Sequence, residues 1–175
     1  MTKRMSTMNR SGVEDFVTPA FNRTPTLGLA SDPTYFGLTS NGKRHGKGIK
    51  FYPNGSQYEG NWKNGKKDGH GTFKFESGGC YIGQWKEDKA HGQGMLVLPN
   101  GSYYTGAFEQ NMKHGDGSWT SIDGQIYEGQ WECDMRHGQG KLTDPDGEVY
   151  DGEWFEDMRN GTGFNNRSNG DTFSG

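Results

Sequence analysis

The sequence predicts an all-β protein: an elongated, twisted, single-layer antiparallel sheet of stacked 23-residue β-hairpins. Three observations predict it. An aromatic residue recurs every 23 positions without insertion or deletion, a glycine and usually a second aromatic residue follow it at alternate positions, and each unit closes near a turn dipeptide. The residues that set the period are Tyr35, Tyr58, Tyr81, Tyr104, Tyr127, Tyr150 and Phe173.

The residues before the first unit do not share this pattern. Residues 1–34 are rich in Ser, Thr and Pro, which predicts a flexible arm that becomes ordered on binding. Thr18 and Thr24 each precede a proline and are candidate phosphorylation sites, although such pairs are also common in unmodified disordered arms. The repeat array is expected to occupy residues 35–175, with units starting at 35, 58, 81, 104, 127 and 150 and a seventh beginning at 173.

Each unit is expected to open with a strand that carries its rings on one face. If the first aromatic residue is position 0 of a unit, the glycine falls at position 2 and the second ring at position 4, and alternate residues of a strand point to the same side. Only the first unit, with Thr39, lacks the second ring. Because a lone hairpin is marginal in water, we expect each unit to bury its rings against the next. The predicted ring core is Tyr58, Trp62, Tyr81, Trp85, Tyr104, Phe108, Tyr127, Trp131, Tyr150 and Trp154.

A second strand is expected after the glycines at positions 11 and 13. Segments such as Thr72 to Phe75 and Met95 to Leu98 are rich in β-branched, aromatic or apolar residues. A turn dipeptide such as Asn54-Gly55 follows, which is a strong hairpin signal because the turn needs positive φ. The glycines at positions 2, 11 and 13 are expected to leave room for neighbouring rings, so that an alanine there would clash.

The composition excludes a wide enzyme core. Only 29% of the 175 residues are hydrophobic and 30 are glycine, which suits a thin stacked sheet. No run is apolar enough to span a bilayer and the amino terminus has no apolar signal segment, so we expect a cytoplasmic protein. Cys80 and Cys133 lie about two units apart, roughly 20 Å in such a sheet, which is too far for a disulfide.

The sequence indicates no catalytic, metal or cofactor site. Gly60 to Lys67 superficially resembles a phosphate loop, but it lacks the magnesium-binding hydroxyl and no helix follows. No Ser-His-Asp or Cys-His arrangement remains once the repeat is set aside. Four histidines share position 10, but repeats about 10 Å apart cannot place them on one zinc ion, so they are expected to be hydrogen-bonding turn residues. These are His45, His91, His114 and His137.

The motifs Tyr-Glu-Gly-x-Trp, His-Gly-x-Gly and Asp/Asn-Gly at a 23-residue period resemble the MORN (membrane occupation and recognition nexus) repeat over residues 35–175. The resemblance implies a curved single-layer sheet used as a docking surface in ciliary radial spokes, other cytoskeletal assemblies or membrane junctions, or attached to enzymes. We therefore expect a non-enzymatic scaffold of a cytoskeletal complex, and specifically of the radial spoke of the ciliary axoneme. Its expected partners are proteins and not nucleic acid, and its expected location is the cytoplasmic cytoskeleton.

An apolar run in the third unit is not explained by the repeat. Met95-Leu96-Val97-Leu98 is apolar at consecutive positions, whereas one face of this strand should meet water. Ile49 and Phe51 stand at positions 14 and 16 of their unit, whereas Phe73 and Phe75 stand at positions 15 and 17 of theirs, so the two pairs alternate out of step. Either a partner or the amino-terminal arm covers the second face. The candidate partners are a helix or extended segment laid on the sheet, or another MORN protein joined end to end.

Other residues left free by the repeat are candidates for partner recognition. In the fifth unit these are Glu128, Gln130, Glu132 and Arg136.

Charge changes sign along the array. Residues 35–80 hold eight Lys or Arg and three acids, whereas residues 127–175 hold four and eleven, which gives net charges near +5 and −7. This pattern predicts either a solvated surface whose sequence drifts or a bipolar rod that orients its partners or stacks head to tail.

Two alternatives to the scaffold stay open. One is a tether to anionic lipid through the basic first units. The other is the targeting module of a longer enzyme, which the stop at the start of a seventh unit would allow. The candidate lipid contacts are Lys43, Arg44, Lys47, Lys50, Lys63, Lys66 and Lys67.

Overall fold

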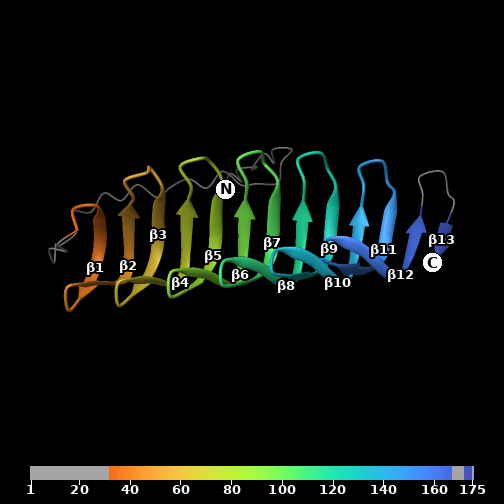
Figure 1. Cartoon of the computed structure of the whole chain (residues 1–175). Helices are drawn as coiled ribbons and strands as arrows, with labels where there is room; N and C mark the ends of the chain where they lie inside the picture. The colour runs from red at the N-terminus through yellow and green to blue at the C-terminus, as the bar shows by residue number, and fades with distance from the viewer. Residues whose placement is uncertain (1–31, 167–171, 175) are drawn as a thin grey trace, which may run out of the picture.

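The computed structural model describes residues 32–166 and 172–174 and places them in one 13-stranded antiparallel sheet. Strand order follows chain order along an elongated sheet (Figure 1), so the predicted fold class is confirmed. The described residues form no helix, and thus none that could cross a membrane. The strands are β1 (Tyr35–Ser40), β2 (Lys43–Phe51), β3 (Gln57–Lys63), β4 (Lys66–Lys74), β5 (Cys80–Lys86), β6 (Lys89–Val97), β7 (Tyr103–Glu109), β8 (Met112–Thr120), β9 (Ile126–Glu132), β10 (Met135–Thr143), β11 (Val149–Phe155), β12 (Met158–Asn166) and β13 (Thr172–Ser174).

Most of the predicted arm, including Thr18 and Thr24, lies outside the described residues. Its last residues are described and are bonded to the first unit. The Thr34 carbonyl accepts a hydrogen bond from Phe51 N–H at 2.9 Å, and Lys50 Nζ lies 2.6 Å from Asp32 Oδ2. Asp32 and Thr34 therefore extend the first hairpin by a short segment before Tyr35.

The two strands of a unit are joined by a tight turn at positions 6 and 7, which the sequence analysis did not anticipate. Both turn residues have positive φ, as at Asn64 (53°) and Gly65 (89°) or Cys133 (51°) and Asp134 (71°). Turns of this kind match the right-handed twist of the flanking strands. Asp134 also accepts a hydrogen bond on Oδ1 from Lys113 N–H of the preceding unit at 2.8 Å. The acid at position 7 thus fits the turn and ties it to the neighbouring unit.

The predicted Asn-Gly and Asp-Gly dipeptides lie in the connections between units. At the first of these, Tyr52 N–H donates to Ser56 O and Gly55 N–H donates to Tyr52 O, both at 2.9 Å. Gly55 has a φ of 88°, whereas Asn54 is not in the left-handed region. The side chain of Asn54 instead accepts a hydrogen bond from Ser56 N–H at 3.2 Å. The predicted turn sites are correct, but positive φ is required only of the glycine.

The second strand of each unit begins earlier than expected. β4 starts at Lys66, so that Gly69 and Gly71 lie inside the strand and not before it. The pairing of β3 with β4 shifts register between Gly60 and Trp62, which marks a β-bulge beside Gly69 (φ 94°). The glycine at position 11 therefore allows a bend in the strand. A simple alternation of residues between the two faces of a strand does not predict this bend.

The core is a continuous ladder of aromatic rings on one face. Tyr58 contacts Trp62 of its own unit with ring centroids 5.0 Å apart and Trp85 of the next unit at 5.3 Å, and both pairs meet edge to face. Each buried tyrosine donates its hydroxyl to a backbone carbonyl three residues ahead, for example Tyr127 to Gln130 O at 2.9 Å. All ten residues of the predicted ring core are buried, which confirms that prediction. The further buried hydrophobic residues among those described are Tyr35, Ala90 and Leu142.

Glycines at positions 2 and 13 allow this packing. A Cβ on Gly129 would lie 2.4 Å from Gly140 Cα, and a Cβ on Gly140 would lie 2.2 Å from the Tyr127 hydroxyl. The expected clash with a ring is therefore confirmed, and the ring is the tyrosine of the same unit. At position 11 no ring is involved. A Cβ on Gly115 would find only Ala107 Cβ at 3.5 Å, whereas one on Gly138 would meet the flexible side chain of Gln130, and both glycines have positive φ (63° and 59°).

Candidate docking surface

The sheet has two chemically different faces. The aromatic face carries the rings and glycines of positions 0, 2 and 4, and the opposite face carries the residues between them. Strand pairing places Ile49 and Met95 in one row of the opposite face and Phe51 and Val97 in the row beside it, because the intervening partners are in register. Four of the six apolar residues singled out in the sequence therefore share this face. Leu96 points to the aromatic face, between its partners Tyr81 and Tyr104.

A cluster of apolar and β-branched side chains lies at the middle of the opposite face. Five of its residues are direct cross-strand partners on β5 to β9, and two more stand in the neighbouring row on β5 and β6. Adjacent strands are about 4.8 Å apart, so the cluster extends about 19 Å across the sheet. We call these seven residues the central patch: Cys80, Ile82, Met95, Val97, Tyr103, Thr120 and Ile126. The row of Val97 continues beyond the patch with Thr143 on β10 and Val149 on β11.

A second apolar group lies at the amino-terminal end of the same face. Phe36 and Phe51 are 49% and 44% exposed and their rings meet edge to face at 6.0 Å, with Ile49 paired to Phe36. Glu59, Gln57, Thr72 and Lys74 of β3 and β4 separate this group from the central patch. The predicted residues therefore form two groups on one face.

Three of the seven candidate lipid contacts are held by intramolecular partners. Arg44 lies over the Trp62 ring at 4.4 Å and Lys67 over Trp85 at 4.0 Å. Burial lowers the pKa of Lys67 to about 8. Lys50 is paired with Asp32, and its hydrogen bond, together with those from Thr34, lowers the pKa of Asp32 to about 2.

The other four, Lys43, Lys47, Lys63 and Lys66, are exposed. Lys66 is 3.6 Å from Glu87. The basic surface available to a membrane is therefore smaller than the sequence suggested.

The candidate residues of the fifth unit also differ in how far their side chains are free to contact a partner. Glu128 is exposed on the opposite face and pairs with Ser118 and Lys141. Gln130 Oε1 accepts a hydrogen bond from Gln139 N–H at 2.9 Å, which fixes that side chain beside the bulge.

Glu132 Oε2 lies 3.5 Å from His137 Nε2. Arg136 stacks over Trp154 at 4.3 Å and donates from Nε to Asp157 Oδ1 at 3.0 Å. Arg136 is thus part of the packing between units, contrary to the expectation that it was free. The recurrence of Lys or Arg at position 9 was the sequence signal that could have shown this.

One junction between units departs from the others. Position 9 holds a cation over the next unit's tryptophan at Arg44, Lys67, Lys113 and Arg136, but the third unit has Ala90. Phe108 stands where that tryptophan would be and has no indole N–H to donate to the preceding unit. Asn111 replaces the turn aspartate and still accepts a hydrogen bond from Ala90 N–H at 2.7 Å. This junction, between the third and fourth units, is neutral.

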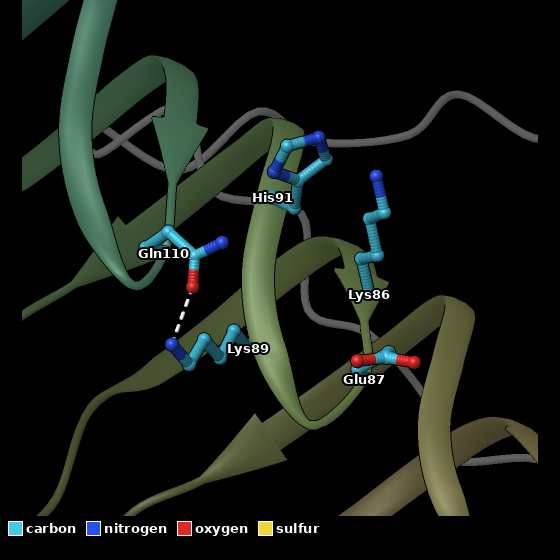
Figure 2. A pocket seen from close by; sticks show the side chains of 5 residues that line it. All are labelled: Lys86, Glu87, Lys89, His91 and Gln110. Atoms are coloured by element: carbon cyan, nitrogen blue, oxygen red, sulfur yellow. Dashed lines mark hydrogen bonds between the residues drawn. The ribbon is translucent and has the colours of Figure 1, made fainter.

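A small depression of about 110 Å³ lies at the turn edge near this junction (Figure 2). Figure 2 shows Lys89 donating to Gln110, with Lys86, Glu87 and His91 around the opening. Its lining is polar and comes from the facing ends of β5 and β6 and from the turns that follow β5 and β7.

The recurrent histidines lie within strands and not in turns, which corrects the sequence analysis. His114 Nε2 is 3.6 Å from Glu109 of the facing strand, and His137 similarly faces Glu132. In the described part of the chain, no group of three or more His, Cys, Asp or Glu residues could hold a metal ion. Cys80 and Cys133 are both free thiols.

Comparison with known proteins identifies the family of the repeat. The family model for the MORN repeat matches six consecutive segments, 35–57, 58–80, 81–103, 104–126, 127–149 and 150–172. No curated protein matches the chain. Among solved structures, the chain is similar to the SAS-4 (dCPAP) TCP domain of Drosophila melanogaster in complex with a proline-rich motif of Ana2 (dSTIL), with 18% identity, a TM-score of 0.47, and coverage of 74% of this chain and 71% of that chain.

It is also similar to the wild-type TCP10 domain of Danio rerio CPAP in complex with a STIL peptide. The identity there is 13% and the TM-score 0.33, with coverage of 80% of this chain and 68% of that chain. Both similarities are weak. The six matched segments, by contrast, begin at the residues that set the 23-residue period.

Proposed function

Because the chain belongs to the MORN repeat family, we propose that it is a non-enzymatic scaffold that docks other proteins of a cytoskeletal assembly on the opposite face of its sheet. The observation that carries this proposal is the central patch. A sheet with one packed face normally alternates apolar and polar residues, so that its second face is polar. Here the second face presents seven apolar or β-branched side chains in register at its middle.

The aromatic face is a poorer candidate. Its rings are buried and their polar atoms bond within the array, as in Trp154 Nε1 to Gly140 O at 2.8 Å. Cations such as Lys113 and Arg136 cover the rings from the other side. A partner that used this face would have to displace those contacts, whereas the central patch needs no rearrangement.

The cytoskeletal setting rests on the family resemblance. We propose a cytoplasmic location, with the radial spoke of a ciliary axoneme as the specific assembly to test first. A targeting module of a longer enzyme could use the same patch, so this alternative differs in what the array is attached to and not in how it binds.

Binding to anionic lipid is the second candidate function. The observation that favours it is the exposed set Lys43, Lys47, Lys63 and Lys66 at one end of the array. Near a membrane surface each such charge contributes about 1 kcal/mol, so four give a weak, salt-sensitive contact. Flotation with phosphatidylserine vesicles measures this contact directly.

Affinity capture from ciliated cells tests the scaffold proposal. We expect the tagged chain to recover axonemal or other cytoskeletal proteins and the double variant Met95→Lys/Val97→Lys to lose them, because two buried charges cannot be accommodated under a partner. The matched control, Gln57→Lys/Thr72→Lys, adds the same charge to the same face outside the patch and should retain them. Circular dichroism should show the β-sheet spectrum in all three proteins. Equal recovery by both variants would contradict the proposal.

A further inference from the structure

Five lysines form a line along the turn edge, the side of the sheet on which positions 6 and 7 of each unit lie. Position 5 belongs to the opposite face, and position 8 is its direct cross-strand partner and points to the same side, as in Lys63 with Lys66 and Lys86 with Lys89. The second and third units have lysine at both positions, and the first unit has it at position 8. All five side chains are exposed. We call them the turn-edge lysines: Lys43, Lys63, Lys66, Lys86 and Lys89.

The turn-edge lysines have few acidic partners. Among the described residues only Lys66 of the five forms an ion pair, with Glu87 at 3.6 Å. Asp68, at position 10 of the second unit, and Asp88, which accepts a hydrogen bond from Lys67 N–H at 2.8 Å, also lie at this edge. The line therefore has more lysines than acids to neutralise them.

The paired lysines repel each other within two successive hairpins. Like charges directly opposite each other on neighbouring strands are destabilising. In the next two units the same positions hold a glutamate and a methionine, Glu109 with Met112 and Glu132 with Met135. The repeat thus does not require lysine at either position, and a bound anion would offset the repulsion.

The depression of about 110 Å³ lies at the end of this line. Lys86 and Lys89 line it together with His91, and Glu87 is the acid in its lining. Figure 2 shows Lys89 turned toward Gln110 of the next hairpin. The lining has a net positive charge, which favours an anionic side chain over a cationic one.

We propose that the turn-edge lysines bind an acidic polypeptide segment in extended conformation, laid across the strands of the first three units. The inference goes beyond the proposed function, because these lysines lie at the turn edge and the central patch lies toward the other end of the strands. Units repeat about every 10 Å, so the line from Lys43 to Lys89 is about 19 Å long, and an extended chain covers this distance with about six residues.

The change of sign along the turn edge favours a short segment over a membrane surface. Beyond Lys89, position 5 of the next two units is Glu109 and Glu132. A flat anionic surface in contact with the lysines also faces these carboxylates, the first of them about 10 Å further on, where repulsion is only partly screened at physiological salt. A segment of about six residues ends before them.

Binding of labelled hexaglutamate to the full chain gives the first test, measured by fluorescence anisotropy. We expect binding that weakens as salt is raised, and Lys63→Gln/Lys86→Gln should lower the affinity at least tenfold. The matched control is Lys74→Gln/Lys141→Gln, which removes the same charge from exposed lysines of the same face away from the turn edge and should bind within about twofold of the native protein. No binding by the native protein, or equal losses in the two variants, overturns the inference.

Extending the line gives the sharper test. Glu109→Lys/Glu132→Lys places lysine at position 5 of the next two units and makes the line about twice as long, which dodecaglutamate can span and hexaglutamate cannot. The affinity ratio of dodecaglutamate to hexaglutamate should be at least tenfold larger for this variant than for the native protein. Glu128→Lys/Asp151→Lys adds the same charge at exposed positions of the same face outside the line, and its ratio should stay within about twofold of the native value. Equal ratios for the two variants contradict the proposed line.

Flotation with phosphatidylserine vesicles separates a polypeptide partner from a lipid surface. We expect either no flotation at physiological salt or flotation that excess hexaglutamate abolishes. Flotation that Lys63→Gln/Lys86→Gln loses but hexaglutamate does not abolish assigns the lysines to lipid and overturns the inference. Met95→Lys/Val97→Lys leaves the turn-edge lysines intact and should bind hexaglutamate as the native protein does, so docking on the central patch is tested separately.

Discussion

At the scale of single residues, the array depends on the close approach of two glycine backbones beneath a tyrosine ring. In the fifth unit Gly129 and Gly140 face each other, and the Tyr127 hydroxyl passes over both to reach Gln130 O. Neither glycine has room for a Cβ: one on Gly129 would meet the backbone of Gln139 and Gly140, which cannot rotate away, and one on Gly140 would meet the Tyr127 ring. The requirement is steric at these positions and conformational at position 11.

The substitution Gly129→Ala should therefore destabilise the fold strongly. Its Cβ would lie 2.4 Å from Gly140 Cα, so the two strands must separate, and we expect the free energy of unfolding to fall by about 3 kcal/mol. Gly115→Ala is the matched control. It meets no close atom but adopts a φ of 63°, which costs about 1–2 kcal/mol. Urea unfolding followed by tryptophan fluorescence compares them, and equal losses would contradict the steric account.

Asp32 should make the stability of the first hairpin depend on acid pH. Its folded pKa of about 2 lies below the ordinary 3.8, because Lys50 and Thr34 donate hydrogen bonds to the ionised carboxylate. A lowered folded pKa stabilises the protein above 3.8, and this contribution is lost as the pH falls through 2. We expect the melting temperature of the native protein to exceed that of Asp32→Asn at pH 6 and the difference to shrink between pH 4 and pH 2. Asp123→Asn, in an exposed turn, should show no such trend.

At the scale of the strand and its unit, the third and fourth units are joined by fewer polar contacts than their neighbours. A cation over an aromatic ring contributes about 0.5–1 kcal/mol at partly exposed sites, and a net hydrogen bond about 1 kcal/mol. Ala90 and Phe108 lack both contributions, whereas Lys67 and Trp85 supply both one unit earlier.

Restoring the regular residues at this junction should stabilise the array. The triple variant Ala90→Lys/Phe108→Trp/Asn111→Asp recreates the set Lys67, Trp85 and Asp88 of the preceding junction. We expect its free energy of unfolding to rise by about 1–2 kcal/mol, with a higher melting temperature. Ala90→Lys alone is the control and should gain less, because Phe108 offers a poorer ring and no indole N–H. A lower melting temperature for the triple variant than for the native protein would show that the neutral set is the better packed one.

Strand pattern and period could be predicted because they depend on side-chain identity at fixed spacing. The tight turns at positions 6 and 7 were missed because only the first two units signal them with Asn-Gly, and later units use pairs such as Cys133-Asp134. The bulge at Gly69 was missed for a related reason, since a glycine near a strand end fits a turn as well as a bend within the strand. Both features depend on backbone conformation, which side-chain alternation does not report.

At the scale of the whole molecule, the sequence placed the apolar residues of the opposite face correctly. Ile49, Phe51, Met95 and Val97 break the expected alternation, and a break in alternation is visible without coordinates. No such break in alternation distinguishes the basic residues that pack on the aromatic face from those that are exposed. Arg44, Lys67 and Arg136 stack on rings of the following unit, a contact between residues 18 positions apart that depends on how neighbouring hairpins align.

The neutral junction also determines how the array comes apart. In a repeat protein, stability is approximately the sum of terms for each unit and for each contact between neighbours, so opening begins where the neighbour term is smallest. Partial opening would separate β1 to β6 from β7 to β12, through the gap between β6 and β7. The central patch lies across this gap, with Met95 and Val97 on one side and Tyr103 on the other. A partner that contacts both sides of this gap binds only when the junction is closed, and therefore stabilises the closed state. Amide hydrogen exchange along β6 and β7 should slow as the fraction of bound protein rises.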